Sequence, residues 1–161
     1  MRGAAAIASF LRPFRAIPQP PALVEGYTVV DGRRPCPDQL NRLLILCGER
    51  PRPAEIWQRV LERSLWHLQV LDAGGQLVGF LRVTSDQALN ANLWDLLSDP
   101  GDPERPRVLA VLVHTALARL RQELAGCSIS LSAPPEAIRA LEAEGFVVDP
   151  GGIRAMGRRL G

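Results

Sequence analysis

The feature that most constrains this chain is a long amphipathic helix in its second half. Hydrophobic residues recur there at spacings of three and four, which places them on one helical face. They are Val108, Leu109, Leu112, Val113, Ala116, Leu117, Leu120 and Leu124. A stripe of roughly four to five turns has to be buried against a second layer of structure. Because strand patterns flank this region, we predict that the helix packs against a β-sheet.

Shorter hydrophobic runs predict the remaining elements. In chain order we expect a strand at 27–30, helices opening near Pro37 and Pro53, strands at 65–72, 76–84 and 91–98, the long helix, a strand at 128–132, a helix from Pro134 to about Glu144, a strand beginning at 146–148 and a last strand near 153–159. Gly74 and Gly75 separate two of these strands, and their tolerance of positive φ favours a hairpin turn.

The length and composition allow one domain. With 161 residues, of which 47% are hydrophobic, the chain can form one core but not two comfortable ones. We place this domain at 26–161. Residues 1–25 form an extension with arginines and prolines but no acidic residue before Glu25. We interpret the extension as a disordered tail, a segment making weak membrane contact or an organelle-targeting leader.

Charge and cysteine content exclude several classes of function. A net charge of +2 gives no field that would favour nucleic acid as a specific partner. The cysteines Cys36, Cys47 and Cys127 form no CxxC pair and have no matching histidine spacing, so we expect no metal site and a reducing, cytoplasmic compartment. No apolar run approaches the roughly 20 residues that span a bilayer.

Three segments carry a distinctive combination of residues: 77–86 (LVGFLRVTSD), 90–100 (NANLWDLLSDP) and 144–156 (EGFVVDPGGIRAM). They resemble the GNAT N-acetyltransferase superfamily, and in particular its plastid and cyanobacterial branch. With the order of elements, the resemblance covers about residues 26–156. It implies the GNAT fold, an α/β (α+β) architecture with a mixed, mostly antiparallel twisted sheet flanked by helices. It also implies acetyl transfer from acetyl-coenzyme A to a primary amine of a protein lysine, a protein N-terminus or a small arylalkylamine.

The resemblance also implies where the cosubstrate acetyl-coenzyme A binds. In the superfamily, glycines at the start of the long helix present backbone N–H groups to its pyrophosphate. The corresponding window here, 104–110, contains no glycine, and Pro106 has no N–H. We expect arginine side chains to compensate, and strand backbone to accept the pantetheine arm. The cofactor-binding residues that we expect are Leu97, Ser98, Arg105, Arg107, Val108 and Leu109.

Two positions bear on catalysis. Where the superfamily often has a tyrosine that protonates the departing thiolate, this chain has Leu141, which cannot donate a proton. The strand that often supplies a general base contains Asp95, which we predict as the catalytic base. The alternative for Asp95 is an ion pair with an arginine or a cap on a neighbouring backbone group. His67 and His114 match no triad or metal spacing, and we assign them no function.

Three functions remain open at this point. The first is an N-acetyltransferase that uses acetyl-coenzyme A directly in a ternary complex with an amine substrate. The second is a catalytically inactive GNAT-like module for protein binding or assembly, which the missing glycines and tyrosine favour. The third is a membrane-tethered regulator that uses the basic segment 1–24. The sequence leaves a homodimer open.

Overall fold

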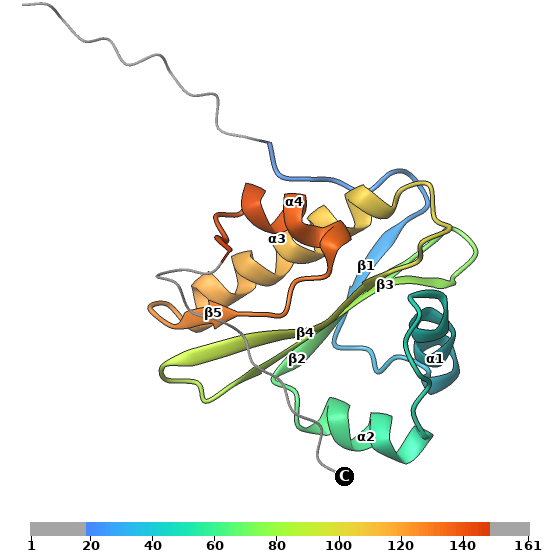
Figure 1. Ribbon diagram of the computed structural model, residues 1–161, viewed down its shortest axis with the longest axis horizontal. Helices are drawn as coiled ribbons and strands as arrows, with labels where there is room; N and C mark the ends of the chain where they lie inside the picture. Colours follow the sequence, from blue (N-terminus) through green and yellow to red (C-terminus); the bar gives the residue numbers. More distant parts are fainter. Residues whose placement is uncertain (1–18, 149–161) are drawn as a thin grey trace, which may run out of the picture.

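A twisted five-stranded sheet with strand order β1-β2-β3-β4-β5 forms the centre of the protein (Figure 1). The computed structural model describes residues 19–148. The strands are β1 (Thr28–Asp31), β2 (Trp66–Leu71), β3 (Leu77–Ser85), β4 (Asn90–Ser98) and β5 (Ser128–Ser130). Neighbouring strands are antiparallel except β4 and β5, which are parallel. The expected mixed, mostly antiparallel sheet of an α/β fold is confirmed.

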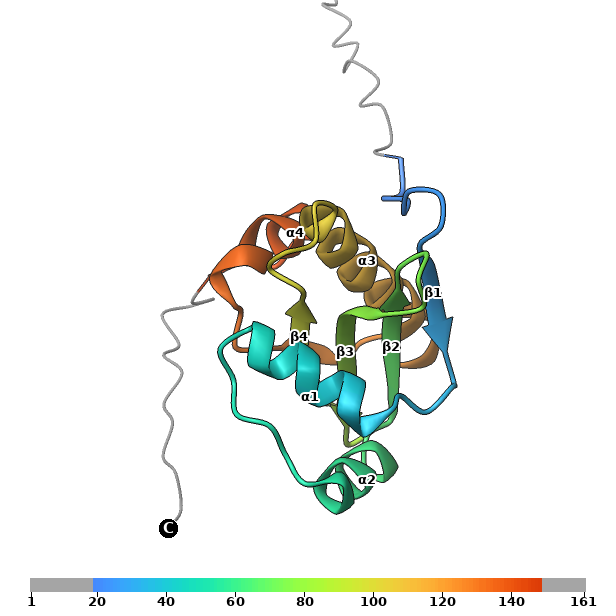
Figure 2. The ribbon, with the colours of Figure 1, turned by 90° about the vertical axis from the view of Figure 1, so that its right-hand side faces the viewer.

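Helices cover both faces of the sheet. They are α1 (Pro37–Leu46), α2 (Ala54–Glu62), α3 (Arg105–Glu123), the short 3-10 helix η1 (Pro135–Ala137) and α4 (Ile138–Ala143). Figure 2 shows α1 and α2 on one face and α3 with α4 on the other. Each face therefore has its own hydrophobic cluster, and the sheet separates the two.

The predicted stripe of the long helix is buried as expected. From Val108 to Leu120, its members are at most 4% exposed, and Leu124 packs partly buried against the same cluster. The helix lies on sheet residues that include Leu68, Val70, Leu81 and Leu93. At about 25 cal/mol per Å² of apolar surface, burying this stripe stabilises the contact between helix and sheet.

The other cluster holds α1 and α2 against the opposite face. Its buried members are Leu40, Leu43, Leu44, Trp57, Leu61, Leu77 and Phe80. Trp57 meets Phe80 edge to face, with ring centroids 6.3 Å apart. Its buried indole N–H donates to Asn41 Oδ1 at 2.8 Å, so α1 satisfies the one polar group that α2 brings into this core.

One expected strand is not formed. Residues 146–148 follow Gly145, which ends α4 at φ +91°, but they belong to no strand. Phe146 packs against the α3 cluster, whereas Val147 and Val148 are 68% and 72% exposed. Within the described part of the chain no strand runs beside them, and an unpaired segment has no ladder to join.

Several other expectations fall on residues that the structure does not describe. The last strand near 153–159 lies outside the described residues, as does most of the extension, of which only 19–25 are described. These seven residues contain no helix or strand. Among residues 19–148, no helix is long and apolar enough to cross a membrane.

The closeness of α3 to the sheet depends on Gly79 in β3. A Cβ atom there would lie 2.5 Å from Val108 Cγ1 and 3.1 Å from Leu112 Cδ1, both on α3. We expect Gly79→Ala to lower the free energy of unfolding by about 1–3 kcal/mol through overpacking, measured by urea denaturation. The control is Gly74→Ala in the hairpin turn, where the nearest atom is the side-chain oxygen of Asp72 at 3.3 Å. Equal losses in both variants would contradict this account.

Candidate functional site

Strands β4 and β5 form a fork. Their parallel pairing covers only 90–92 of β4 against 128–130 of β5, and β4 then continues to Ser98 paired with β3 only. The N–H of Asp99 donates to Val78 O in β3 at 2.9 Å. Because backbone groups alternate between the two edges of a strand, those of Leu96 and Ser98 face the open side of the fork. The Cys47 thiol donates to Ser98 O at 3.4 Å, which agrees with a Ser98 carbonyl that points away from β3.

A bulge in β4 lies within this stretch, which pairs with β3 but not with β5. Leu97 faces Phe80 and Trp94 faces Arg82, so two β4 residues stand opposite one residue of β3. Asp95 adopts φ +50°, a left-handed conformation that is uncommon for a residue other than glycine. Bulges bend a strand and redirect its side chains. This one presents the Asp95 carboxylate to two arginines.

Both carboxylate oxygens of Asp95 face guanidinium groups. Arg82 Nε lies 2.5 Å from Oδ2, and Arg52 Nη1 lies 3.4 Å from Oδ1. The Asp95 side chain is only 12% exposed. A general base needs a free oxygen within reach of the amine, and here each oxygen already accepts from an arginine. The geometry matches the alternative interpretation of Asp95, an ion pair.

The segment between α1 and α2 holds Arg52 in place. Asn41 accepts from the Arg52 backbone N–H and donates to the Arg52 carbonyl, both at 2.9 Å. The Arg52 guanidinium also lies 4.9 Å from the centroid of the Trp57 ring. The sequence did not identify Arg52 and Arg82 as partners of Asp95, because no local pattern shows which arginine will pair with an aspartate elsewhere in the chain.

A basic groove lies beside this ion pair. Its volume is about 290 Å³, and its lining residues are Ile56, Arg59, Val60 and Arg63 of α2 with Arg82 and Thr84 of β3. Within residues 19–148, neither Arg59 nor Arg63 forms an ion pair, whereas Arg82 shares Asp95. The half-exposed Trp94 donates its indole N–H to Thr84 Oγ1 at 2.8 Å. The groove therefore combines two free positive charges with apolar walls.

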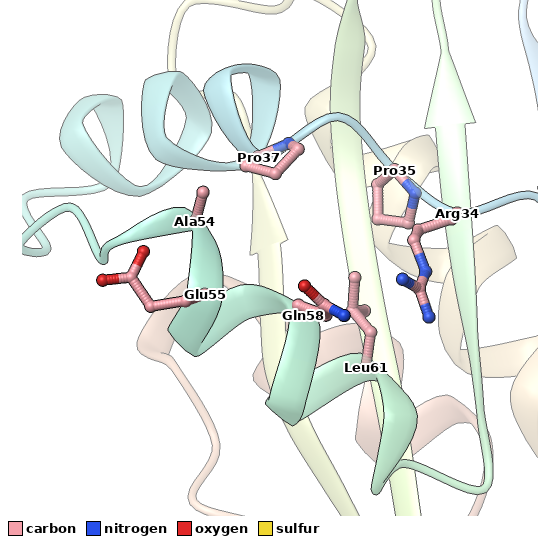
Figure 3. Close-up of a pocket in the computed structure, with 7 residues that line it drawn as sticks. All are labelled: Arg34, Pro35, Pro37, Ala54, Glu55, Gln58 and Leu61. Atoms are coloured by element: carbon pink, nitrogen blue, oxygen red, sulfur yellow. The ribbon is translucent and has the colours of Figure 1, made fainter.

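A further hollow, of about 240 Å³, lies between α2 and the segment that leads into α1 (Figure 3). Its lining is Arg34, Pro35, Pro37, Ala54, Glu55, Gln58 and Leu61. The amide of Gln58 donates to Glu62 at 3.0 Å, and the remaining polar groups are surface charges. This hollow contains no nucleophile or histidine, and it lies at α2 rather than at the fork. We assign it no chemistry.

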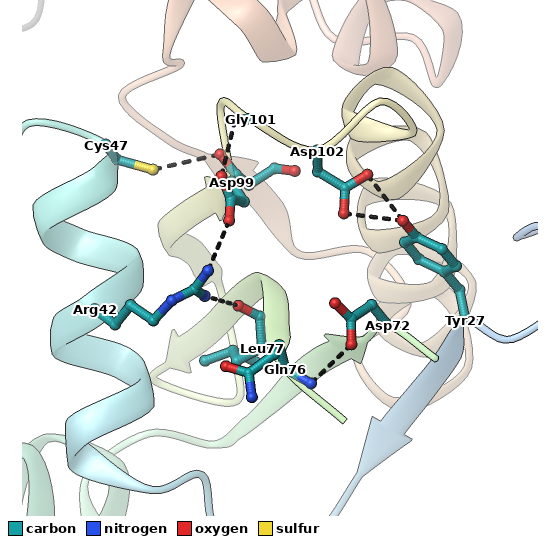
Figure 4. Close-up of polar contacts among 10 residues, drawn as sticks. Tyr27, Arg42, Cys47, Asp72, Gln76, Leu77, Asp99, Gly101 and Asp102 are labelled. Carbon is teal, nitrogen blue, oxygen red and sulfur yellow. Dashed lines mark hydrogen bonds and ion pairs between the residues drawn. The ribbon is translucent and has the colours of Figure 1, made fainter. Parts of the chain in front are cut away.

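The loop before α3 uses all of its own backbone N–H groups. Two Asp-Pro-x repeats at 99–104 each form an Asx turn, in which an aspartate side chain accepts from the N–H two residues on (Figure 4 shows Asp99 and Asp102). Pro100, Pro103 and Pro106 have no N–H. The other donors bond as follows: Gly101 to Asp99 Oδ1 (2.8 Å), Asp102 to Asp99 O (3.1 Å), Glu104 to Asp102 Oδ1 (2.7 Å), Arg105 to Asp102 O (3.1 Å), and Arg107 and Val108 to Glu104 O (2.9 Å each).

Side chains complete this internal arrangement. Tyr27 donates its hydroxyl to both oxygens of Asp102 at 3.1 Å (Figure 4). Desolvation and this hydrogen bond raise the pKa of Tyr27. Arg42 pairs with Asp99 at 3.3 Å. An anion at the start of α3 is therefore already present, and it is the carboxylate of Asp102.

The structure distributes the predicted cofactor residues as follows. Arg105 pairs with Glu136 of η1 at 2.5 Å, and Arg107 pairs with Glu104 at 3.4 Å. Val108 and Leu109 point into the core, at 0% and 1% exposure. The side chain of Leu97 packs against the α1 and α2 cluster. Leu97 pairs with Phe80, which turns its backbone groups toward β3, and its contact with the cofactor stays a prediction.

Ser98 and Cys47 lie together at the end of β4. Ser98 is fully buried, and its Oγ has no hydrogen-bond partner among the described residues. Burial raises the pKa of the Cys47 thiol, so that it stays protonated near neutral pH and can donate to Ser98 O. The sequence analysis considered Cys47 as a metal or disulfide candidate and did not place it at the fork.

Comparison with known proteins identifies the family. No protein-family model matches the chain. An uncharacterized N-acetyltransferase named ycf52 from Pyropia yezoensis is 36% identical over 121 residues, which cover 73% of this chain and 68% of that protein. The chain belongs to the GNAT superfamily of N-acetyltransferases. Its place in the plastid-type branch agrees with a chloroplastic GCN5-related N-acetyltransferase of Arabidopsis thaliana, 35% identical over 81 residues, or 50% of this chain and 31% of that protein.

Solved structures support the same fold. The protein SA2161 of Staphylococcus aureus, described as a probable acetyltransferase, superposes with a TM-score of 0.72 at 17% identity. The match covers 83% of this chain and 99% of that one. This likeness extends the GNAT assignment to the arrangement of sheet and helices.

GNAT proteins generally use acetyl-coenzyme A, and the two halves of that molecule fit this chain differently. The open backbone of Leu96 and Ser98 fits the amide-bearing pantetheine arm. The start of α3 does not fit the pyrophosphate, because its N–H groups are absent or already bonded. At the position predicted for the superfamily's tyrosine, Leu141 is buried in the core at 3% exposure and cannot act on a thiolate.

The ion pairs of Asp95 make a prediction about stability. We expect Asp95→Asn to lower the free energy of unfolding by about 2–3 kcal/mol, because two guanidinium groups lose a nearly buried counter-charge. Asp31→Asn is the matched control. Asp31 is 52% exposed in its pair with Arg119, so its loss should cost less than about 1 kcal/mol. Urea denaturation of both variants tests this, and similar small losses would contradict the structural role of Asp95.

Proposed function

We propose that this protein transfers the acetyl group of acetyl-coenzyme A to a primary amine. The observation that carries the proposal is the fork, where β4 continues beyond its pairing with β5 and leaves backbone groups open. Membership in the GNAT superfamily supports the reaction class. Acetyl-coenzyme A would supply an activated acetyl group on a thioester.

The open edge of β4 binds and orients the donor in this proposal. The backbone of Leu96 and Ser98 accepts an extended amide-bearing arm in the way that an edge strand accepts another strand. An N–H group of this edge donates to the thioester carbonyl oxygen and polarises it toward attack by the amine. Since β3 pairs with the other side of β4, these backbone N–H groups are held in place before acetyl-coenzyme A binds.

We assign Asp95 the role of a positioning residue that holds Arg52 and Arg82. As the C–N bond forms and the C–S bond breaks, the proton of the amine passes to solvent water and the departing coenzyme A thiolate takes a proton from water. General acid or base groups contribute typically 10²- to 10⁴-fold. With Asp95 in ion pairs and Leu141 in the core, we expect slow turnover on amines of high pKa.

The dependence of kcat/KM on pH distinguishes a positioning role of Asp95 from a general-base role. We expect Asp95→Asn to keep the shape of the wild-type dependence of kcat/KM on pH, with a loss of less than about tenfold, because the variant still fills the same space. A general base would instead give a loss of about 10²-fold or more and a missing acidic limb. Thermal unfolding of the same samples shows that the variant is folded at the assay temperature.

The groove of Arg59, Arg63 and Arg82 supports an acceptor with negative charge near its amine. It lies directly beside the bulge, and two of its three guanidinium groups have no counter-ion within the described part of the chain. Attraction between these arginines and an acidic acceptor raises its local concentration. Among protein lysines, protein N-termini and arylalkylamines, acceptors with acidic neighbours are the best match.

A peptide series tests this preference. We expect lysine peptides flanked by glutamates to exceed those flanked by arginines in kcat/KM by at least about threefold at low salt, and the ratio to fall at 0.5 M salt as charges are screened. The double variant Arg59→Gln, Arg63→Gln should remove the difference. Arg139→Gln, an exposed arginine on α4, is the control that should keep it. Equal rates for both peptides in the wild type would contradict the acidic acceptor.

A second candidate function is an inactive GNAT-like module that binds a partner. The self-satisfied loop before α3 favours it, as do the ion pairs of Asp95 and the leucine at 141. Mass spectrometry of an amine panel incubated with acetyl-coenzyme A discriminates the two. Transfer above the uncatalysed rate supports the enzyme, and its absence for every amine and every donor supports the module.

A further inference from the structure

We infer that this protein recognises its acyl donor through the pantetheine arm and thioester alone, so that nucleotide-free pantetheine thioesters serve as well as coenzyme A thioesters. The inference rests on the proposed function. It concerns the class of acyl donor. Three observations support it: the loop at 99–108, the ion pair between Arg105 and Glu136, and the open edge of β4.

The first step concerns hydrogen-bond donors. A helix start binds phosphate through N–H groups that lack an internal partner. Between 99 and 108, every backbone N–H is either missing at a proline or bonded within the protein. A pyrophosphate would have to displace the carboxylate of Asp102, which also accepts from Tyr27. This displacement would replace one anion with another and would leave the Asp102 carboxylate without the groups that now donate to it.

The second step concerns charge. The carboxylates of Asp99, Asp102, Glu104 and Glu136 surround the start of α3. The arginines that face them are Arg42, Arg105 and Arg107, and each already forms an ion pair. Arg105 is the least exposed of the three arginines, at 25%, and its partner Glu136 is 31% exposed. Among residues 19–148, four acidic groups here face three basic ones, so these side chains offer a pyrophosphate no net attraction.

The third step concerns the other half of the donor. Leu96 and Ser98 keep their backbone toward the fork whatever side chains stand at the start of α3. An arm that pairs with this edge uses backbone shape alone. The arm and the pyrophosphate thus bind to different parts of the chain, and only the part for the arm is open.

Isothermal titration with two probes tests the inference. We expect S-acetylpantetheine and acetyl-coenzyme A to bind with dissociation constants within about threefold of each other. A working pyrophosphate site makes several charge-assisted hydrogen bonds, each of which changes affinity by roughly tenfold to a hundredfold. A preference of thirtyfold or more for acetyl-coenzyme A would therefore overturn the inference.

A variant pair tests the role of the ion pair. We expect Glu136→Gln to free Arg105, so that acetyl-coenzyme A gains about tenfold in affinity while S-acetylpantetheine is unchanged. Glu142→Gln, an exposed glutamate on the neighbouring α4, should change neither affinity. If Glu136→Gln left the ratio of the two affinities unchanged, the claim that this pair withholds Arg105 from phosphate would be wrong.

The results also separate this inference from the proposed function. Tight binding and turnover with acetyl-coenzyme A alone would overturn the inference and leave the proposed function in place. Binding of neither probe at millimolar concentration would overturn both. Turnover with both probes at similar kcat/KM supports both.

Discussion

The burial of one face of α3 against the sheet is the interaction on which the rest of this structure depends. The stripe from Val108 to Leu120 meets the sheet closely because Gly79 has no side chain to hold the helix away. This contact fixes the first turn of α3 beside the end of β4. The loop at 99–104, the fork and η1 are then brought together around that turn.

The start of α3 shows how a binding site can be filled by the chain itself. A helix N-terminus attracts an anion because its first N–H groups are unpaired. Here Asp102 is that anion, and the proline-rich loop removes several donors altogether. The open edge of β4, by contrast, is a property of the strand pairing and does not depend on those side chains. The two halves of a coenzyme A site can therefore change independently in one fold.

Much of the fold could be predicted because burial leaves periodic patterns in a sequence. The long stripe, the glycine hairpin and the alternating strands each specify their element locally. The strand expected to begin at Phe146 is not formed at 146–148, because a strand needs a partner and none runs beside these residues within 19–148; three hydrophobic residues do not show whether a partner is present. The Asx turns before α3 did have a signal in the sequence, the repeated Asp-Pro-x at 99–104, which predicts turn-capping aspartates.

The sequence by itself determined the order of elements from β1 to α4, the family and the loss of glycines at the start of the long helix. Only the tertiary structure decided what the charged residues do. Asp95 meets Arg52 from 43 residues away, and Arg105 meets Glu136 from 31 residues away. Local periodicity encodes which residues are buried, whereas the partner of a charge is set by which distant segments converge, and that depends on the packing of the whole core.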